Sequence, residues 1–222
     1  MKYSDITKLK HLAQDKISRS ANPAVVRNST VFFKNMQELI KQENLVKKGS
    51  KVDFYEYGRA GSQTTIALQN FISDLEGAHR TFLTSTGFGA VALAILSMCR
   101  PKDEIIVTDA VYAPTRMITS KLLKEFNVKT HFYNPESLES LKSKINKKTK
   151  MIFVENPGSN TFEFQDLSKI VSLAKKKKIF TLLDNTWGTP LYLKPLKIGF
   201  DMSFCSATKY FSGHSDAMGG SL

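Results

Sequence analysis

Cysteine and tryptophan are scarce in this chain. Its 222 residues include 2 cysteines and 1 tryptophan. Cys99 and Cys205 lie inside apolar runs, and neither is part of a C-x-x-C spacing or flanked by histidine. This pattern argues against a zinc site and against a disulfide framework. We therefore expect two reduced, buried thiols and no metal.

Long apolar segments are also missing. No stretch reaches the roughly 18 uninterrupted apolar residues that a membrane helix requires. The first residues, MKYSDITKLKHLAQDK, lack the apolar centre of a secretory signal. We therefore expect a cytoplasmic protein with no membrane partner.

Arginine is the third shortage. The formal net charge of +12 comes from 32 basic residues, of which 6 are arginine and 26 are lysine. Phosphate and base recognition favours the bidentate guanidinium group, so this balance argues against a nucleic-acid partner. The densest run, Lys175 to Lys178, closes the helical pattern DLSKIVSLAKKKK, where cations offset the negative end of the helix dipole.

Apolar runs alternate with helical spacing along most of the chain. The predicted strands are TFLT, EIIVT, VKTHFY, KMIFVE, IFTLLD and MSFCSA, and the predicted helices between them include SLESLKSKI and QDLSKIVSLAKK. This alternation predicts one main α/β domain with a mostly parallel sheet sandwiched by helices. Ligands of such sheets bind at the carboxyl ends of the strands.

Chemically useful residues follow four of these strands. The glycine turn STGFGAVALAIL opens a helix, whose free N–H groups form an anion seat. Tyr112 follows the second strand, Asp184 ends a later one, and Lys209 follows the last. Each alone has a simpler explanation: a core aromatic, a helix cap or a surface lysine. Together they suit pyridoxal phosphate, because its carbonyl, pyridine nitrogen and phosphate need a lysine, a carboxylate and an anion seat.

One motif supports a different cofactor. GFGAVA, from Gly87 to Ala92, fits the G-x-G-x-x-G/A pattern of dinucleotide-binding folds, and Asp109 follows twenty residues after Gly89. A nicotinamide oxidoreductase is therefore an alternative. It ranks lower because it leaves Asp184 and Lys209 without a purpose.

Six separated words also resemble one known family, the Cys/Met-metabolism family of pyridoxal-phosphate enzymes. They run from Tyr55 to the last residue and are YEYGRAGSQTT, LEGAHRTFLTSTGFGAV, VYAPTR, FVENPGSNTFEFQDL, LLDNTWGTPLY and SATKYFSGHSDAMGG. The resemblance implies the aspartate aminotransferase-like fold, called fold type I, with a mostly parallel seven-stranded sheet. It also implies that residues 1–54 form an arm on a neighbouring subunit and that residues 55–222 form the cofactor-binding domain.

The resemblance implies roles for individual residues. Lys209 matches the Schiff-base lysine, Asp184 the partner of the pyridine nitrogen, and Tyr112 the ring that stacks on the cofactor and transfers protons. Asn156 matches a residue near the cofactor ring, and Trp187 would shape the substrate pocket. The phosphate would be held by Gly87, Phe88, Ser206 and Thr208, and by Tyr57 and Arg59 from a neighbouring subunit, where Tyr57 also borders the substrate pocket.

The implied activity is carbon–sulfur lysis. DNTW and HSDAM resemble the cystathionine β-lyase branch, which converts cystathionine to homocysteine, pyruvate and ammonia, whereas Gly188 to Pro190 resembles the γ-acting synthase, lyase and sulfhydrylase branches. Members of the family form dimers or tetramers and continue into a C-terminal domain that binds the substrate carboxylate. The expectation is a fragment of a longer protein or a truncated, non-catalytic paralogue.

Overall fold

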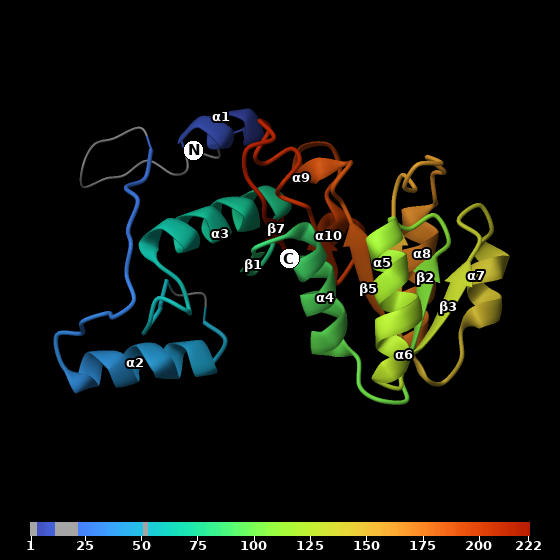
Figure 1. The fold of residues 1–222 in the computed structure, drawn as a ribbon, viewed down its shortest axis with the longest axis horizontal. Coiled ribbons are helices and arrows are strands. Elements are labelled where there is room, and N and C mark those ends of the chain that lie inside the picture. The colour runs from blue at the N-terminus through green and yellow to red at the C-terminus, as the bar shows by residue number, and fades with distance from the viewer. Residues whose placement is uncertain (1–3, 12–21, 51–52) are drawn as a thin grey trace. The chain divides into compact units, whose positions relative to one another are not determined.

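The computed structural model describes residues 4–11, 22–50 and 53–222, and it divides into two compact units, Met1–Thr81 and Phe82–Leu222. The described part of the first unit contains α1 (Asp5–His11), α2 (Met36–Lys47) and α3 (Gln63–Glu76) (Figure 1). The predicted arm of residues 1–54 stays a prediction.

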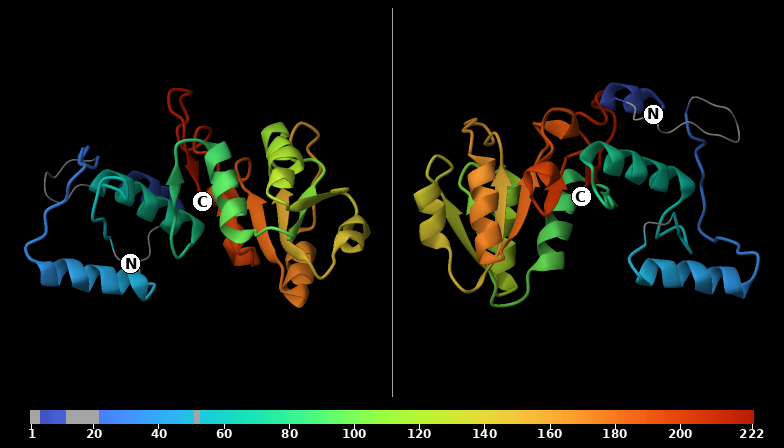
Figure 2. Two further views of the ribbon diagram at one scale, coloured as in Figure 1. Left: turned by 60° about the horizontal axis from the view of Figure 1, so that its bottom comes forward. Right: turned by 180° about the vertical axis from the view of Figure 1, so that it is seen from behind.

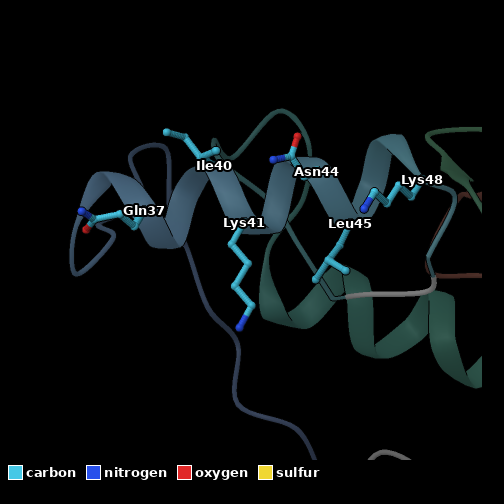
Figure 3. A pocket seen from close by; sticks show the side chains of 6 residues that line it. All are labelled: Gln37, Ile40, Lys41, Asn44, Leu45 and Lys48. Atoms are coloured by element: carbon cyan, nitrogen blue, oxygen red, sulfur yellow. The ribbon is translucent and has the colours of Figure 1, made fainter.

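Helix ends in the first unit follow ordinary capping chemistry. The Asn35 side chain accepts the N–H of Glu38 at the start of α2, and Ser62 caps α3 together with Thr65. One side of α2 borders a hollow of about 410 Å³ (Figure 3). Two lysines, two amides and two aliphatic side chains line it, namely Lys41, Lys48, Gln37, Asn44, Ile40 and Leu45.

The second unit is built on a five-stranded parallel sheet in the order β3-β2-β4-β5-β6. The strands are β2 (Glu104–Thr108), β3 (Lys129–Tyr133), β4 (Thr149–Glu155), β5 (Phe180–Asp184) and β6 (Met202–Phe204). Four of these strands lie within a run predicted from the sequence, and β4 begins one residue before its predicted run KMIFVE. The α/β class with a parallel sheet is therefore confirmed.

Helices cover both faces of this sheet, as Figure 2 shows for α4 and α5 on one face and α7 and α8 on the other. The helices of this unit are α4 (Gly87–Met98), α5 (Ala113–Met117) continued by the π-helical turn η1 (Ile118–Leu122) and α6 (Leu123–Glu125), α7 (Leu138–Lys144), α8 (Leu167–Lys177), α9 (Thr189–Tyr192) and α10 (Pro195–Ile198). Lys178 caps α8 in the left-handed conformation, so the lysine run ends a helix as predicted.

Alternate residues of the strands pack into two separate hydrophobic cores. In β4, Met151 and Phe153 pack with α4, while Ile152 and Val154 pack with α7 and α8. All four side chains are fully buried. This two-sided burial explains why the strands read as continuous apolar runs rather than as alternating patterns.

The predicted seven-stranded sheet is divided into two ladders. Beside the five parallel strands, β1 (Leu83–Thr84) pairs antiparallel with β7 (Gly220–Ser221). An isolated bridge between Cys205 and Ser221 links the pair to the segment after β6. Cys99 and Cys205 are buried and not joined in a disulfide, as predicted. Within the described ranges, every helix is too short or too polar to cross a membrane.

The strand order places a crevice at one edge of the sheet. The chain runs from β2 outward to β3 and then returns across β2 to β4. The connections after β2 and β4 therefore leave in opposite directions, and a crevice opens between the carboxyl ends of these two strands. The site residues predicted from the sequence follow these and neighbouring strands.

Candidate functional site

A cavity of about 690 Å³ lies at the carboxyl edge of the sheet. Its walls come from α4 and from the segments that follow β2, β4, β5 and β6. The structure brings eight predicted residues together there: Gly87, Phe88, Tyr112, Asp184, Trp187, Ser206, Thr208 and Lys209. Residues that are spread over more than a hundred positions of the sequence thus line the same cavity.

The N-terminus of α4 opens into this cavity. Thr86 caps the helix, since its hydroxyl oxygen accepts the N–H of Gly89 at 2.9 Å. The N–H groups of Gly87 and Phe88, two residues and one residue before Gly89, have no carbonyl partner within the helix. These groups and the positive end of the helix dipole form a seat for an anion.

Glycine is required at position 87 because the chain after β6 passes very close. A Cβ at this position would lie 2.6 Å from Ser206 Oγ and 2.7 Å from Ser206 Cβ. Van der Waals contacts between carbon atoms are about 3.5–4.0 Å. The glycine therefore lets the Ser206 hydroxyl sit directly beside the first turn of α4, where both can contact one bound anion.

Asp184 ends β5 and is 7% exposed. One of its carboxylate oxygens accepts the N–H of Thr186 at 2.9 Å, and the Thr186 hydroxyl accepts the N–H of Ser206 at 2.9 Å. Burial raises the pKa of Asp184 to about 6. A positively charged group bound beside this carboxylate would favour its ionised form.

Lys209 lies in a turn that is tied to the antiparallel pair. Its N–H donates to the Ser206 carbonyl, and its own carbonyl accepts the N–H of Gly213 at 2.8 Å. The neighbouring Thr208 hydroxyl accepts the N–H of Gly219 at 3.1 Å. The backbone around Lys209 is therefore fixed, while its side chain is exposed at the cavity.

Aromatic side chains border the cavity. Tyr112 is 51% exposed and immediately precedes α5. The Trp187 ring lies edge-on to Phe162 and Tyr210, with ring centroids 5.7 Å and 6.5 Å apart. Trp187 and Tyr210 both line the cavity. Trp187 is thus a wall of the cavity, in the region predicted for a substrate pocket.

Three predicted residues are not among those that line the cavity. Tyr57 and Arg59 lie in the first unit, where the Arg59 guanidinium is 5.6 Å from the centre of the Tyr57 ring. Asn156 is buried, and its side-chain oxygen accepts the N–H of Gln165 at 2.7 Å. Their proposed contacts with a cofactor stay predictions.

Sequence reasoning missed Glu155. This residue ends β4, lines the cavity and is paired in register with Asp184 of β5. One of its carboxyl oxygens accepts the N–H of Tyr112 at 2.7 Å. Burial, reinforced by the charge of Asp184, raises the pKa of Glu155 to about 8. The signal was present, because Glu155 closes the apolar run KMIFVE as Asp184 closes IFTLLD.

The site residues fit pyridoxal phosphate. The N–H groups of the first turn of α4 and the Ser206 hydroxyl, which the missing Cβ of Gly87 admits beside them, suit a phosphate. The buried Asp184 carboxylate suits a protonated ring nitrogen, and the exposed amine of Lys209 suits an aldehyde carbon. Asp109, which the dinucleotide alternative requires, instead pairs with Arg116 at 2.5 Å.

The chain is similar to curated proteins of one family. The family model described as Cys/Met metabolism PLP-dependent enzyme matches residues 7–222. A Saccharomyces cerevisiae protein provisionally named cystathionine β-lyase is 38% identical over 204 residues, which cover 92% of this chain and 57% of that protein. The cystathionine β-lyase of Haemophilus influenzae is 32% identical over 201 residues, which cover 90% of this chain and 50% of that protein. The chain therefore spans about half the length of these relatives.

Solved structures share the fold. A Campylobacter jejuni protein provisionally named O-acetylhomoserine (thiol)-lyase matches with a TM-score of 0.90 and 28% identity. The match covers 100% of this chain and 54% of that chain. That structure holds N'-pyridoxyl-lysine-5'-monophosphate. The cystathionine γ-synthase of Xanthomonas oryzae pv. oryzae has a TM-score of 0.87 and 27% identity, with coverages of 100% and 54%.

Proposed function

Since the chain belongs to the Cys/Met metabolism family of pyridoxal-phosphate-dependent enzymes, we propose that its cavity binds this cofactor and serves a carbon–sulfur lyase. The proposed reaction is β-elimination of cystathionine, which with one water gives homocysteine, pyruvate and ammonia. The observation that carries the proposal is the meeting of Lys209, Asp184 and the open end of α4 in one cavity. Similarity to relatives named cystathionine β-lyase supports the choice of reaction.

Each residue has a proposed task. Lys209 would hold the cofactor covalently, and its amine would remove the proton from the substrate Cα. Asp184 would hold the protonated ring nitrogen, and Tyr112 would contact the ring. Gly87, Phe88 and Ser206 hold the phosphate. The cofactor itself supplies an electron sink for the charge left on Cα.

A γ-acting enzyme is the second candidate. The likeness to the γ-synthase structure over the whole chain supports it, as does the sequence from Gly188 to Pro190. Product analysis separates the two candidates. Cystathionine yields pyruvate by β-elimination and 2-oxobutanoate by γ-elimination, so the identity of the 2-oxo acid is decisive. Because the chain spans half of its relatives, this assay also belongs on any longer protein that contains it.

The cofactor proposal has a direct test. Pyridoxal phosphate is added to the protein, the mixture is reduced with borohydride, and the peptides are analysed by mass spectrometry. We expect a pyridoxyl group on Lys209, and none in a Lys209→Ala variant. Lys142→Ala is the matched control, since Lys142 pairs with Glu139 on the surface of α7. Labelling spread over many lysines, with no preference for Lys209, would contradict the proposal.

We also propose that the protein acts as a homodimer or homotetramer. The resemblance of Tyr57 and Arg59 to residues that reach a neighbouring subunit's phosphate supports this. Sedimentation analysis tests it directly, and a protein that stays monomeric with bound cofactor would overturn it. Arg59→Ala then tests the contact: we expect weaker cofactor binding in the oligomer, whereas an unchanged affinity would remove Arg59 from the site.

A further inference from the structure

Glu155 joins three strand ends of the cavity. It closes β4, which lies between β2 and β5 in the sheet. On one side its backbone is in register with Asp184 at the end of β5. On the other side its carboxyl oxygen accepts the N–H of Tyr112, in the turn that follows β2, at 2.7 Å. The residue thus touches one proposed cofactor-binding residue and neighbours a second.

The hydrogen bond from the Tyr112 N–H to the Glu155 carboxyl group helps to fix the position of Tyr112. Tyr112 precedes α5 in a non-helical conformation, and this helix start has no side-chain cap. Two residues earlier, the Ala110 carbonyl accepts the N–H of Ser159 at 2.7 Å. The Ser159 bond fixes the start of the turn, while the Glu155 bond fixes the residue whose ring stands at the cavity.

The charge around Glu155 adds a second observation. The ionisable groups that line the cavity with it are Asp184 from β5, Tyr112 from the turn after β2, and Lys209 and Tyr210 from the segment after β6. Asp184 is the more buried of the two acids, which by itself disfavours its ionised form, but both the backbone and the side chain of Thr186 form hydrogen bonds with it. Glu155 receives one backbone N–H, so Asp184 is the acid whose ionised form is better stabilised. Two adjacent carboxyl groups in a poorly hydrated site cannot both ionise at low cost.

We propose that Glu155 is a positioning residue, which holds the Tyr112 backbone through its carboxyl oxygen and keeps Asp184 ionised by carrying the single proton that the two groups share. The neutral carboxyl still accepts the Tyr112 N–H, so both tasks are compatible. The hydrogen bond between the Tyr112 N–H and Glu155 does not require a bound ligand. The benefit to the ring nitrogen rests on the proposed cofactor site.

The first arm of the test uses the full chain without cofactor. The protein is labelled with ¹⁵N-tyrosine, which gives resonances for 7 tyrosines, and Tyr112→Phe identifies the Tyr112 amide. We expect this resonance to titrate with a midpoint well above the ordinary glutamate value of about 4.3. In Asp184→Asn the midpoint should fall, because the neighbouring charge is gone. In Glu155→Gln the titration should vanish while the amide stays near its low-pH position.

The second arm measures affinity for pyridoxal phosphate at pH 7. Glu155→Gln preserves a neutral acceptor, so its Kd should stay within about 2-fold of wild type. Glu155→Ala removes the acceptor and should bind about 2- to 12-fold more weakly, the range for one lost hydrogen bond. Glu139→Gln, the same change at an exposed site on α7, controls for net charge.

The outcomes separate the two proposals. If the Tyr112 amide does not titrate, or titrates at the ordinary glutamate value, the inference about Glu155 is overturned. It is also overturned if the Gln variant binds as weakly as the Ala variant, because a neutral acceptor then does not suffice. A wild-type protein that binds no pyridoxal phosphate would refute the proposed function, and the amide titration would still decide the role of Glu155.

Discussion

Replacing Gly87 by alanine tests the closest approach in the proposed phosphate seat. The added Cβ would lie 2.6 Å from Ser206 Oγ, 2.7 Å from its Cβ and 3.1 Å from its Cα. Rotating the hydroxyl away relieves the first contact alone. The other two involve atoms fixed by the backbone, so α4 and the segment after β6 must separate by nearly 1 Å.

The expected cost follows from these distances. Overpacking of this kind costs about 1–3 kcal/mol. Alanine offsets part of it, because glycine is the poorer helix former by up to about 1 kcal/mol. We therefore expect Gly87→Ala to lower the free energy of unfolding by about 1–2 kcal/mol. For a domain of this size, that corresponds to a fall in Tm of roughly 3–8 °C.

The assay is urea unfolding followed by circular dichroism, with two comparisons. Gly89→Ala places the same methyl group two residues later, where the nearest atoms are 3.3 Å and 3.4 Å away. We expect that variant to match the wild type or to gain slightly in stability. Ser206→Gly removes the obstructing side chain, so in the double variant Gly87→Ala should cost at least 1 kcal/mol less than it does alone. Equal costs in both backgrounds would refute this packing.

Three further predictions concern the site and its supports. The folded state holds a proton on Glu155 that the unfolded state releases near pH 4.5. The free energy of unfolding of the wild type should therefore fall relative to that of Glu155→Gln by roughly 2–4 kcal/mol as pH rises from about 5 to 8. Urea unfolding measures this difference, and a difference that does not change with pH would contradict the raised pKa of Glu155. Trp187, the one tryptophan of the chain, lines the cavity, so pyridoxal phosphate should quench intrinsic fluorescence saturably, and a linear, non-saturating loss would argue against binding there. Asp166→Ala removes the cap of α8 and should cost about 1 kcal/mol, whereas Asp166→Asn should retain most of it.

The sequence predicted the α/β fold and the meeting of Tyr112, Asp184 and Lys209 at one cavity for one physical reason. Strands buried on both faces are continuous apolar runs, and the carboxyl ends of parallel strands share one edge. Listing the polar residues after each run therefore found Tyr112, Asp184 and Lys209 as neighbours. The predicted run TFLT contains β1, whereas β7 was missed because a two-residue strand has no period that distinguishes it from loop residues.

The charge state of the site could not be predicted in the same way, because it depends on pairing between strands. Nothing in KMIFVE or IFTLLD fixes which residue of one run stands beside which residue of the other. Register decides this, and it places Glu155 opposite Asp184 at the last rung of the ladder. A shift by one residue would turn one carboxyl to the opposite face of the sheet and remove the repulsion. The shared proton is therefore a property of the strand pairing, and neither strand would show it alone.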